Sequence, residues 1–478
     1  MTKKIIYLVL LTVISGLVAF FVLPLVSAAG SLSYQTYIDL ARKDVDKNRY
    51  GAALGYYNEA LLQQPNNTDL LIEMGRVYGW SDRYNAAIRC YEKVIAVDPS
   101  RRDDVLVPLA LQYLWSDRPR TAARLLQEFV SRHPENTDAQ INLARAQYWA
   151  GVDELGLATL QKLPADQAIQ AKPLLQVIKD NLDNNLNINY ERSHDTDDLN
   201  TDIYGFNVTY HPTLTTSLIP QVRLAHLDQT GQVIDGRSFY LAFRDRFGGL
   251  DSGYGLLYPT IRLGERSYSG QGITPWDTTA WDAALKWLPA DSWRVDFNAG
   301  NEIIENMPSI QNHVTYTSTS LGADYRYAPG ATVSLGAGVG SFGDGNYRTQ
   351  YVNRWLYNFS TVPSVTLGLE GIHYIDSDPS ISRGYYNPAD YTQGLILMNV
   401  RKELFGWVWQ ARVGWGQLWE NPGLTGFLLV YRFSVGKTVP GFGSAEIYYG
   451  ESGPTSIVAE ANNTYRRNYG GIMLTKFL

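Results

Sequence analysis

The chain has 478 residues, enough for two domains, and its formal net charge of −6 without a long run of Lys or Arg argues against a nucleic-acid partner. A single cysteine, Cys90, excludes an internal disulfide, and we expect it to be a buried free thiol. Nine of the 12 Trp follow residue 190, and Trp and Tyr concentrate where a surface is partly apolar and partly wet, as at a membrane interface.

The first 29 residues have the pattern of a secretory signal peptide. Lys3 and Lys4 precede an almost wholly apolar run from residue 5 to residue 26, and small residues follow at Ala28 and Ala29. This order predicts cleavage after Ala28 or Ala29. The alternative is an uncleaved inner-membrane anchor, because the run is long enough to span a bilayer.

Residues 30–183 are predicted to form a helical-repeat domain. Proline, alanine and tryptophan each recur about every 34 residues, and each unit has the pattern of two amphipathic helices. The recurring residues are Pro65, Pro99 and Pro134; Ala53, Ala87 and Ala122; Trp80, Trp115 and Trp149. Residues 34–165 resemble the tetratricopeptide repeat, with three clear units and a degenerate fourth. The resemblance implies an α-solenoid whose concave face contacts a protein partner, and we interpret the three Trp as stacking core.

From residue 184 to residue 478 the hydrophobic period changes to two, which predicts β-strands. Trp407, Trp409 and Trp415, for example, alternate with Gln410 and Arg412. About 16 such segments follow one another, each about ten residues long, as strands that cross a membrane require. The alternation is unclear around residues 254, 351 and 395. After residue 30 there is no apolar run of spanning length, so a membrane-embedded protein must be a closed barrel.

The connections between these segments alternate in length. Short ones occur at residues 288–291, 327–330, 361–363 and 404–406, whereas long ones occur at 267–277, 302–313 and 376–390. Outer-membrane barrels have short periplasmic turns and long outer loops. The fold class is therefore predicted as α + β, with an N-terminal solenoid followed by a transmembrane antiparallel barrel of about 16 strands. A large soluble β-sandwich is the alternative, but it does not explain the alternating loops.

A barrel of this size can leave a water-filled lumen. If the apolar side chains of each strand face lipid, the alternate positions line the pore, and these include the basic Arg223, Arg244, Arg262, Lys286, Arg294, Arg326, Arg348, Arg354, Arg412 and Arg432 and the acidic Asp282, Asp296, Asp324, Glu370 and Glu446. The basic excess favours anionic or neutral cargo over cationic cargo. Alternatively, the opposite charges pair and only maintain the shape of the barrel.

The order of signal peptide, repeats and barrel is similar to that of outer-membrane exopolysaccharide exporters, the group that includes the poly-N-acetylglucosamine export porin and the cellulose synthase outer-membrane subunit. Residues 342–348 look like the Ser-Asp-Gly-Asn turn of the former, and residues 384–391 look like the Gly-Tyr-Tyr-x-Pro segment of such barrels. Asp344-Gly345-Asn346 is also simply a good hairpin turn. This chain has fewer repeats than the large exporters.

The resemblance implies an outer-membrane pore, with the repeats in the periplasm, that passively exports a polysaccharide to the cell surface. The repeats would guide the polymer or bind a periplasmic protein. The alternative is a surface receptor or adhesion barrel of the phage-adsorption type, with Tyr385 and Tyr386 on the long 376–390 connection as the contact surface. We expect no catalytic residue, metal or cofactor, because the sequence lacks paired zinc-binding His, a Gly-rich phosphate loop and a serine elbow.

Overall fold

The structure, a computed structural model, describes residues 32–165, 167–379, 384–421, 424–453 and 465–478. The predicted signal peptide at residues 1–29 lies outside the described residues. The chain divides into two compact units, Met1–Pro99 and Ser100–Leu478. The second unit contains the later helices together with all the strands, so the division falls within the repeat region.

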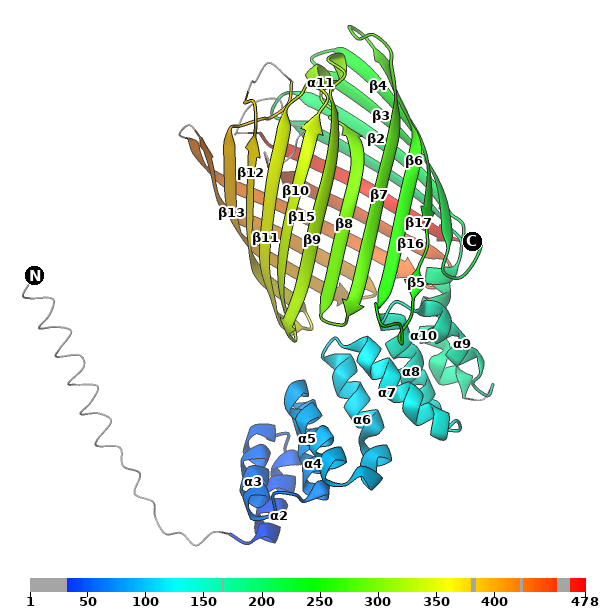
Figure 1. The fold of residues 1–478 in the computed structure, drawn as a ribbon, viewed down its shortest axis with the longest axis vertical. Coiled ribbons are helices and arrows are strands. Elements are labelled where there is room, and N and C mark those ends of the chain that lie inside the picture. Colours follow the sequence, from blue (N-terminus) through cyan, green and yellow to red (C-terminus); the bar gives the residue numbers. More distant parts are fainter. Residues whose placement is uncertain (1–31, 166, 380–383, 422–423, 454–464) are drawn as a thin grey trace, which may run out of the picture. The chain divides into compact units, whose positions relative to one another are not determined.

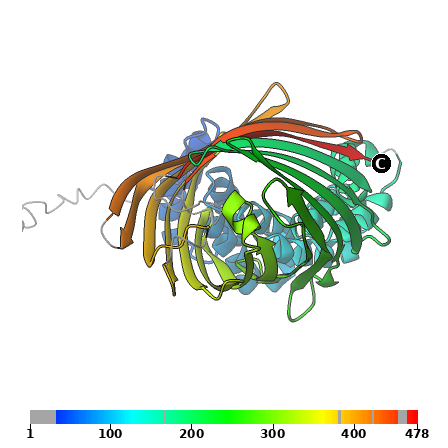
Figure 2. The ribbon, with the colours of Figure 1, turned by 90° about the horizontal axis from the view of Figure 1, so that it is seen from above.

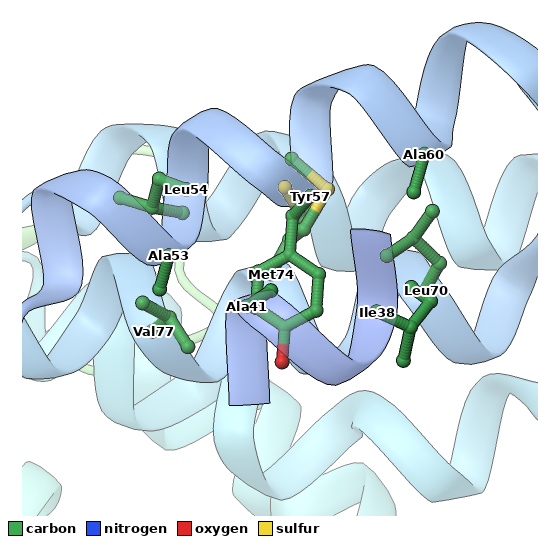
Figure 3. Close-up of a cluster of buried hydrophobic side chains, with 10 residues drawn as sticks. Ile38, Ala41, Ala53, Leu54, Tyr57, Ala60, Leu70, Met74 and Val77 are labelled. Atoms are coloured by element: carbon green, nitrogen blue, oxygen red, sulfur yellow. The ribbon is translucent and has the colours of Figure 1, made fainter. Parts of the chain in front are cut away.

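The first unit contains two helix pairs, α2 (Tyr34–Val45) with α3 (Tyr50–Gln63) and α4 (Thr68–Trp80) with α5 (Tyr84–Val97). Asn67 caps α4 by accepting a hydrogen bond from the amide of Leu70 at 3.0 Å. Tyr57 and Met74 are buried in its core, which also contains the small residue Ala53 at a position where two helices approach closely (Figure 3). Cys90 is buried in the same cluster, as predicted.

A short 3-10 turn, η1 (Pro99–Arg101), connects to the helices of the second unit. These are α6 (Arg102–Trp115), α7 (Pro119–Arg132), α8 (Thr137–Trp149), α9 (Asp153–Gln161) and α10 (Ala168–Leu182). The first helices of successive pairs begin at Tyr34, Thr68, Arg102 and Thr137, which confirms the predicted repeat period. Pro119 occupies the first turn of α7, where its missing amide proton costs nothing.

The repeated tryptophans are not core residues, contrary to the prediction. Trp80, Trp115 and Trp149 are 56%, 47% and 50% exposed. Each is the last residue of the first helix of its pair, whereas the alanines at positions 53, 87 and 122 are fully buried. The small residues therefore make the close helix contacts, and each Trp presents about half of its surface to solvent.

Sixteen long strands follow in the described residues: β1 (Asn185–Asp195), β2 (Leu199–Thr209), β3 (Ser217–Gln229), β4 (Gln232–Arg244), β6 (Leu256–Gly270), β7 (Trp276–Ala290), β8 (Trp293–Ile303), β9 (Thr315–Ala328), β10 (Ala331–Phe342), β11 (Tyr347–Thr361), β12 (Ser364–Asp376), β13 (Asp390–Leu404), β14 (Trp407–Asn421), β15 (Leu424–Val439), β16 (Gly443–Ser452) and β17 (Arg467–Phe477). A two-residue strand, β5 (Phe247–Gly248), pairs beside β6. Each strand pairs with the preceding one in antiparallel orientation. The last strand, β17, also pairs with the first, β1, from Asn185 opposite Phe477 to Asp195 opposite Arg467. The predicted closed barrel is thus confirmed (Figures 1 and 2).

One face of the barrel wall carries exposed apolar side chains that stand opposite one another on neighbouring strands. Leu263 pairs with Trp281, Phe297 with Leu321, and all four are exposed. Such a surface is unfavourable in water and suits lipid, because contiguous exposed apolar area is costly for a soluble protein.

The connections at the end where β1 starts include the short turns 291–292, 329–330, 362–363 and 405–406. The other end carries longer connections at 304–314 and 377–389, in agreement with the predicted alternation. Several connections differ from it, among them the short ones 196–198 and 230–231 at this other end. The predicted long loop at 267–277 spans only residues 271–275 because β6 and β7 extend further, and residues 245–255, which contain β5, form a long connection at the first end.

Among the described residues, no helix combines the length and the apolar character needed to cross a membrane.

Candidate functional site in the lumen and at the helix-covered end of the barrel

The cross-strand register places the charged residues expected at the lumen on one common face of the wall. Arg262 stands opposite Asp282 and Arg354 opposite Glu370, whereas the exposed apolar residues occupy the alternate positions. The same alternation, followed from pair to pair around the barrel, puts each of the fifteen residues on this face: Arg223, Arg244, Arg262, Asp282, Lys286, Arg294, Asp296, Asp324, Arg326, Arg348, Arg354, Glu370, Arg412, Arg432 and Glu446.

Most of the basic members of this set have acidic partners. Pairs within the set are Arg262–Asp282 at 2.8 Å, Arg294–Asp296 at 2.6 Å, Arg432–Glu446 at 3.0 Å, and Arg354–Glu370. Three more basic residues pair with acids that the sequence did not single out, namely Arg223 with Glu305, Arg348 with Asp376 and Arg326 with Asp117. The predicted excess of positive charge is therefore largely neutralised. Within the described part of the chain, Arg244, Lys286 and Arg412 have no acidic partner within ion-pair distance.

The connection between β8 and β9 folds onto the inner wall of the barrel. It contains the short helix α11 (Met307–Gln311), which Asn306 caps through the amide of Ser309 at 2.8 Å. Met307 and Ile310 are buried against inward residues of β3, β4 and β6, including Tyr268. In the view from above, α11 lies within the ring of strands (Figure 2). This connection therefore narrows the lumen at the end away from the helices.

A partly buried ion pair holds the connection in place. The guanidinium of Arg223 on β3 donates two hydrogen bonds to the carboxylate of Glu305, each 2.5 Å long, and Tyr268 Oη donates a third at 2.8 Å. Burial by itself would raise the pKa of Glu305, but the charge of Arg223 and these hydrogen bonds keep that pKa below its ordinary value. Glu305 is thus a carboxylate that is charged and fully partnered inside the barrel.

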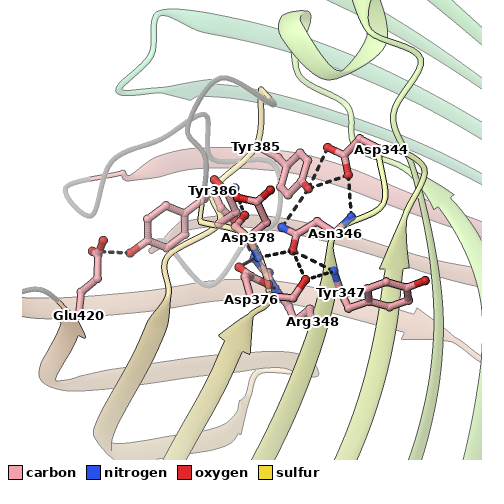
Figure 4. A network of polar contacts seen from close by, with 11 residues as sticks. Asp344, Asn346, Tyr347, Arg348, Asp376, Asp378, Tyr385, Tyr386 and Glu420 are labelled. Carbon is pink, nitrogen blue, oxygen red and sulfur yellow. Dashed lines mark hydrogen bonds and ion pairs between the residues drawn. The ribbon is translucent and has the colours of Figure 1, made fainter.

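The described residues 384–389 of the long connection before β13 also pack inward, and Tyr385 and Tyr386 are not exposed, contrary to the expectation. Their side chains are 0% and 3% exposed, so in this structure they do not form a surface for an outside partner. Tyr385 Oη donates to Asp344 at 3.0 Å and accepts from Asn346 Nδ2 at 3.2 Å, and Tyr386 Oη donates to Glu420 at 2.7 Å (Figure 4). The two rings are therefore anchors that fix the connection to the turn at residues 343–346 and to β14.

The same network includes the ion pair of Arg348 with Asp376 at 2.7 Å, and Arg348 also donates to the Tyr386 carbonyl at 2.6 Å (Figure 4). The two inward connections contact each other, because Ser309 Oγ donates to the carbonyl of Gly384 at 2.8 Å. Gly384 has φ +87° and a Cβ there would lie 2.6 Å from Pro308 Cβ, so only glycine fits. Part of the connection, residues 380–383, lies outside the described residues.

At the opposite end, the β7–β8 turn caps helix α7. The Asp291 carboxylate accepts hydrogen bonds from the amides of Arg120 and Thr121 and from Thr121 Oγ1, each at 3.0 Å. The first amides of a helix have no partner within the helix, and its positive end favours a carboxylate. Arg120 also donates to the carbonyl of Leu288 at 2.6 Å. A turn of the barrel therefore supplies the N-cap of a repeat helix 170 residues earlier in the chain.

Further contacts fix the α8–α9 turn to the barrel. Arg246 pairs with Glu154 and donates to the Gly151 carbonyl at 2.9 Å, and Tyr258 Oη donates to the same carbonyl at 3.0 Å. Val152 is fully buried in an apolar cluster with Leu256 of β6. Hydrogen bonds, an ion pair and apolar packing therefore act together at this junction.

Two cavities lie at this junction. One, of about 870 Å³, is lined by Trp149 and by rim residues of β7 to β9, and the other, of about 610 Å³, is lined by the α9 and α10 region and by inward residues of β4, β6, β7 and β8. They share Tyr258, Lys286 and Arg294. Volumes in this range are typical of ligand sites in proteins. The predicted lumen residues Arg244, Lys286, Arg294, Asp296, Asp324 and Arg326 line one or both of them.

Sequence reasoning missed Glu305, Asp117 and Asp291 as members of the lumen and its helix-covered end. Glu305 and Asp291 lie in connections and Asp117 lies between two helices, so the strand alternation contains no signal for them. The 34-residue recurrence of Trp149 marked it as part of the repeat. That recurrence does not show whether its side of the helix faces the core or solvent.

No protein-family model and no curated protein matches the chain. Among solved structures, a bacterial polysaccharide outer membrane secretin is similar over 62% of this chain and 99% of its own, at 12% identity and a TM-score of 0.50. CdiB from Acinetobacter baumannii (11% identity, 61% of this chain and 60% of that chain, TM-score 0.40) and MamA from Desulfovibrio magneticus RS-1 (18% identity, 30% and 83%, TM-score 0.28) are too dissimilar to bear on the fold. The share matched by the secretin is close to that of the barrel, residues 185–477, and at this identity the likeness shows that the two proteins have a common fold.

Proposed function

We propose that the chain is an outer-membrane pore that exports a polysaccharide from the periplasm to the cell surface. The observation that carries the proposal is the closed barrel, whose outer face is apolar and whose inner face is lined by ion pairs, with helices fixed across one end. The short turns and the helices α7 to α10 of the second unit share that end, which fits a periplasmic position because outer-membrane barrels have short turns on that side. The fold shared with a polysaccharide outer membrane secretin supports the same cargo class.

The proposed mechanism is passive conduction. A chain pushed from the periplasm would pass the repeats, which guide it or bind a periplasmic protein, and then slide along the polar wall. Weak contacts at several places suit transit, since tight binding would stop it. The near balance of charge in the lumen is compatible with anionic or neutral cargo. In this proposal the chain has no catalytic role.

The pore and its export role are tested separately. The mature protein should fractionate with the outer membrane, require detergent for extraction, and give stepwise ion conductance in a planar bilayer. Deleting its gene should reduce the polymer that the cell secretes, and re-expression should restore it. Recovery from the soluble periplasm without detergent would contradict the pore, and unchanged secretion in the deletion strain would contradict the export role.

A receptor of the phage-adsorption type is the other candidate. The buried side chains of Tyr385 and Tyr386 do not support it, because these two residues were its expected contacts. Loss of phage sensitivity with intact polymer secretion after gene deletion would favour it over export.

A further inference from the structure

We infer that the helix-covered end of the barrel contains a binding site for an acidic stretch of sugar polymer, in which Lys286 and Arg244 pair with a carboxylate and Trp149 stacks on a sugar ring. The inference rests on the proposed function, for which it names a substrate class and a place of first contact. It depends on the charges that line the cavities, on the exposed ring of Trp149 and on the rigidity of the junction.

The acidic groups around the 610 Å³ cavity are already engaged. Glu154 pairs with Arg246, and Asp296 pairs with Arg294 at 2.6 Å. Asp245 accepts from Thr216 Oγ1 at 3.1 Å, and Asp153 accepts from Asn181 Nδ2 at 3.3 Å. Two of the acids that line this space are therefore neutralised by ion pairs, and the other two accept hydrogen bonds from polar side chains.

Two basic groups around the same cavity remain without an acidic partner in the described ranges of the chain. They are Arg244, at the end of β4, and Lys286, on β7. The Lys286 ammonium lies 4.2 Å from the centre of the Tyr258 ring, a contact that orients the charge without neutralising it. A partly enclosed cation without a counter-ion favours an anionic ligand, since the pairing gains more there than in bulk water. The natural occupant is the carboxylate of an acidic sugar unit.

Trp149 supplies the other half of the site. Its side chain is half exposed and lines the 870 Å³ cavity, which shares Lys286 with the charged one. A cavity lined by both an exposed indole and a cation suits a pyranose, whose faces are apolar and whose rim is polar. Because Asp291, Glu154 and Gly151 fix α7 and the α8–α9 turn to the barrel, the ring and the two cations are held in one geometry.

The test is isothermal titration calorimetry on the full chain in detergent, with an oligogalacturonate as the acidic probe and a malto-oligosaccharide of the same length as the neutral one. We expect the acidic probe to bind and its affinity to fall with added salt. Replacing both cations, by Lys286→Ala with Arg244→Ala, should weaken binding about tenfold or more, because each hydrogen-bonded charge pair is lost. Trp149→Ala should weaken both probes.

Matched variants control for folding and for total charge. Arg412→Ala removes a lumen cation that also has no acidic partner in the described residues but lies on β14, outside both cavities. It should bind the acidic probe as the unmodified chain does, and Lys286→Arg, which keeps the charge, should retain most of the affinity. Each variant must keep the heat-modifiable mobility of a folded barrel.

Equal affinity for the two probes, or equal loss in Arg412→Ala and in the double variant, would overturn the inference. The outcome is separable from that of the proposed function. If the chain does not bind the acidic probe but conductance and secretion are normal, this site is wrong and the pore stands. If the chain binds the probe specifically but neither conducts nor supports secretion, the site stands and the pore is wrong.

Discussion

At the scale of single residues, a few polar side chains form contacts that the neighbouring sequence does not predict. Asp291 lies in a two-residue turn between strands, yet its carboxylate caps a helix. Glu305 precedes α11, yet its partner Arg223 lies on the wall of the barrel. In both cases the partner is far along the chain, so the role of the residue depends on how the chain folds.

Asp291→Ala should loosen the start of α7. Loss of an N-cap costs about 1 to 2 kcal/mol, and hydrogen exchange at the amides of Arg120 and Thr121 should accelerate accordingly. Asp251→Ala, which removes an exposed carboxylate from the neighbouring connection, should leave both amides unchanged. Equal exchange in the two variants would show that the cap does not stabilise this helix.

Cys90 provides a second test at this scale. Burial raises the pKa of its thiol to about 11, so at pH 8 only a small fraction is the reactive thiolate. We expect slow labelling by a thiol reagent in the native protein, faster labelling as the pH approaches 11, and complete labelling in denaturant. No other cysteine contributes to the signal. Rapid stoichiometric labelling of the native protein at pH 8 would show that the thiol is not buried.

At the scale of elements, the main finding is that two long connections pack inside the barrel. Helix α11 buries Met307 and Ile310 against the inner wall, and the segment after residue 384 places Tyr386 in a cluster with Tyr391 and Leu395 of β13. This explains why the alternation is unclear near residue 395, since both faces of β13 are apolar there. One face is exposed at Ile396, and the other packs against the connection.

Glu305→Gln should release the β8–β9 connection from the wall. Removing one partner of a fully buried ion pair costs about 3 to 5 kcal/mol, and the cost here should be smaller because the side chains of Arg223 and Glu305 are 28% and 18% exposed. Single-channel conductance in a planar bilayer should rise or become noisier. Glu302→Gln, which makes the same change of charge three residues earlier, should have little effect. If the two variants behave alike, the connection is not held by this pair.

The same ion pair gives a dependence on pH. The pKa of Glu305 in the folded protein is below its ordinary value of about 4.3. The ion pair therefore stabilises the connection fully at any pH above that ordinary value. This stabilisation is lost as the pH falls through the lower pKa of the folded state. Conductance of the unmodified pore should therefore rise only well below about pH 4. Glu305→Gln should show no such transition. A rise between pH 5 and 7 would point to another group.

At the scale of the whole molecule, closure of the sheet decides whether a lumen exists. The first and last strands pair along their full length, with Asn189 opposite Met473. Residues directly opposite on antiparallel strands have Cβ atoms about 4.5 to 5.5 Å apart, close to the range that a disulfide spans. The pairing thus joins parts of the chain that are separated by the entire barrel sequence.

An engineered disulfide tests this closure. In a Cys90→Ser background, Asn189→Cys with Met473→Cys should oxidise to a cross-link in the folded protein and raise the temperature at which its compact mobility in SDS is lost. The mismatched pair Asn189→Cys with Asn399→Cys places the second cysteine on β13 and should not cross-link. Absence of a cross-link in the matched pair would mean that the sheet is open.

The class of each half of the chain followed from local patterns of residues, since hydrophobic period is a local property. The 34-residue recurrence reports a helix pair, and a period of two over about ten residues reports a membrane strand. The same local alternation assigned the charged residues of each strand to one face, which the register keeps together around the wall.

The contacts of those residues, in contrast, could be known only from the folded chain. The ion partners Glu305, Asp376 and Asp117, the cap on α7, the inward course of both connections and the exposure of Trp149 each depend on segments that are distant in sequence. The hydrophobic period of a segment shows which side of a helix or strand is apolar. It does not report which distant segment comes to lie against that side, and that segment determines how much positive charge remains unpaired.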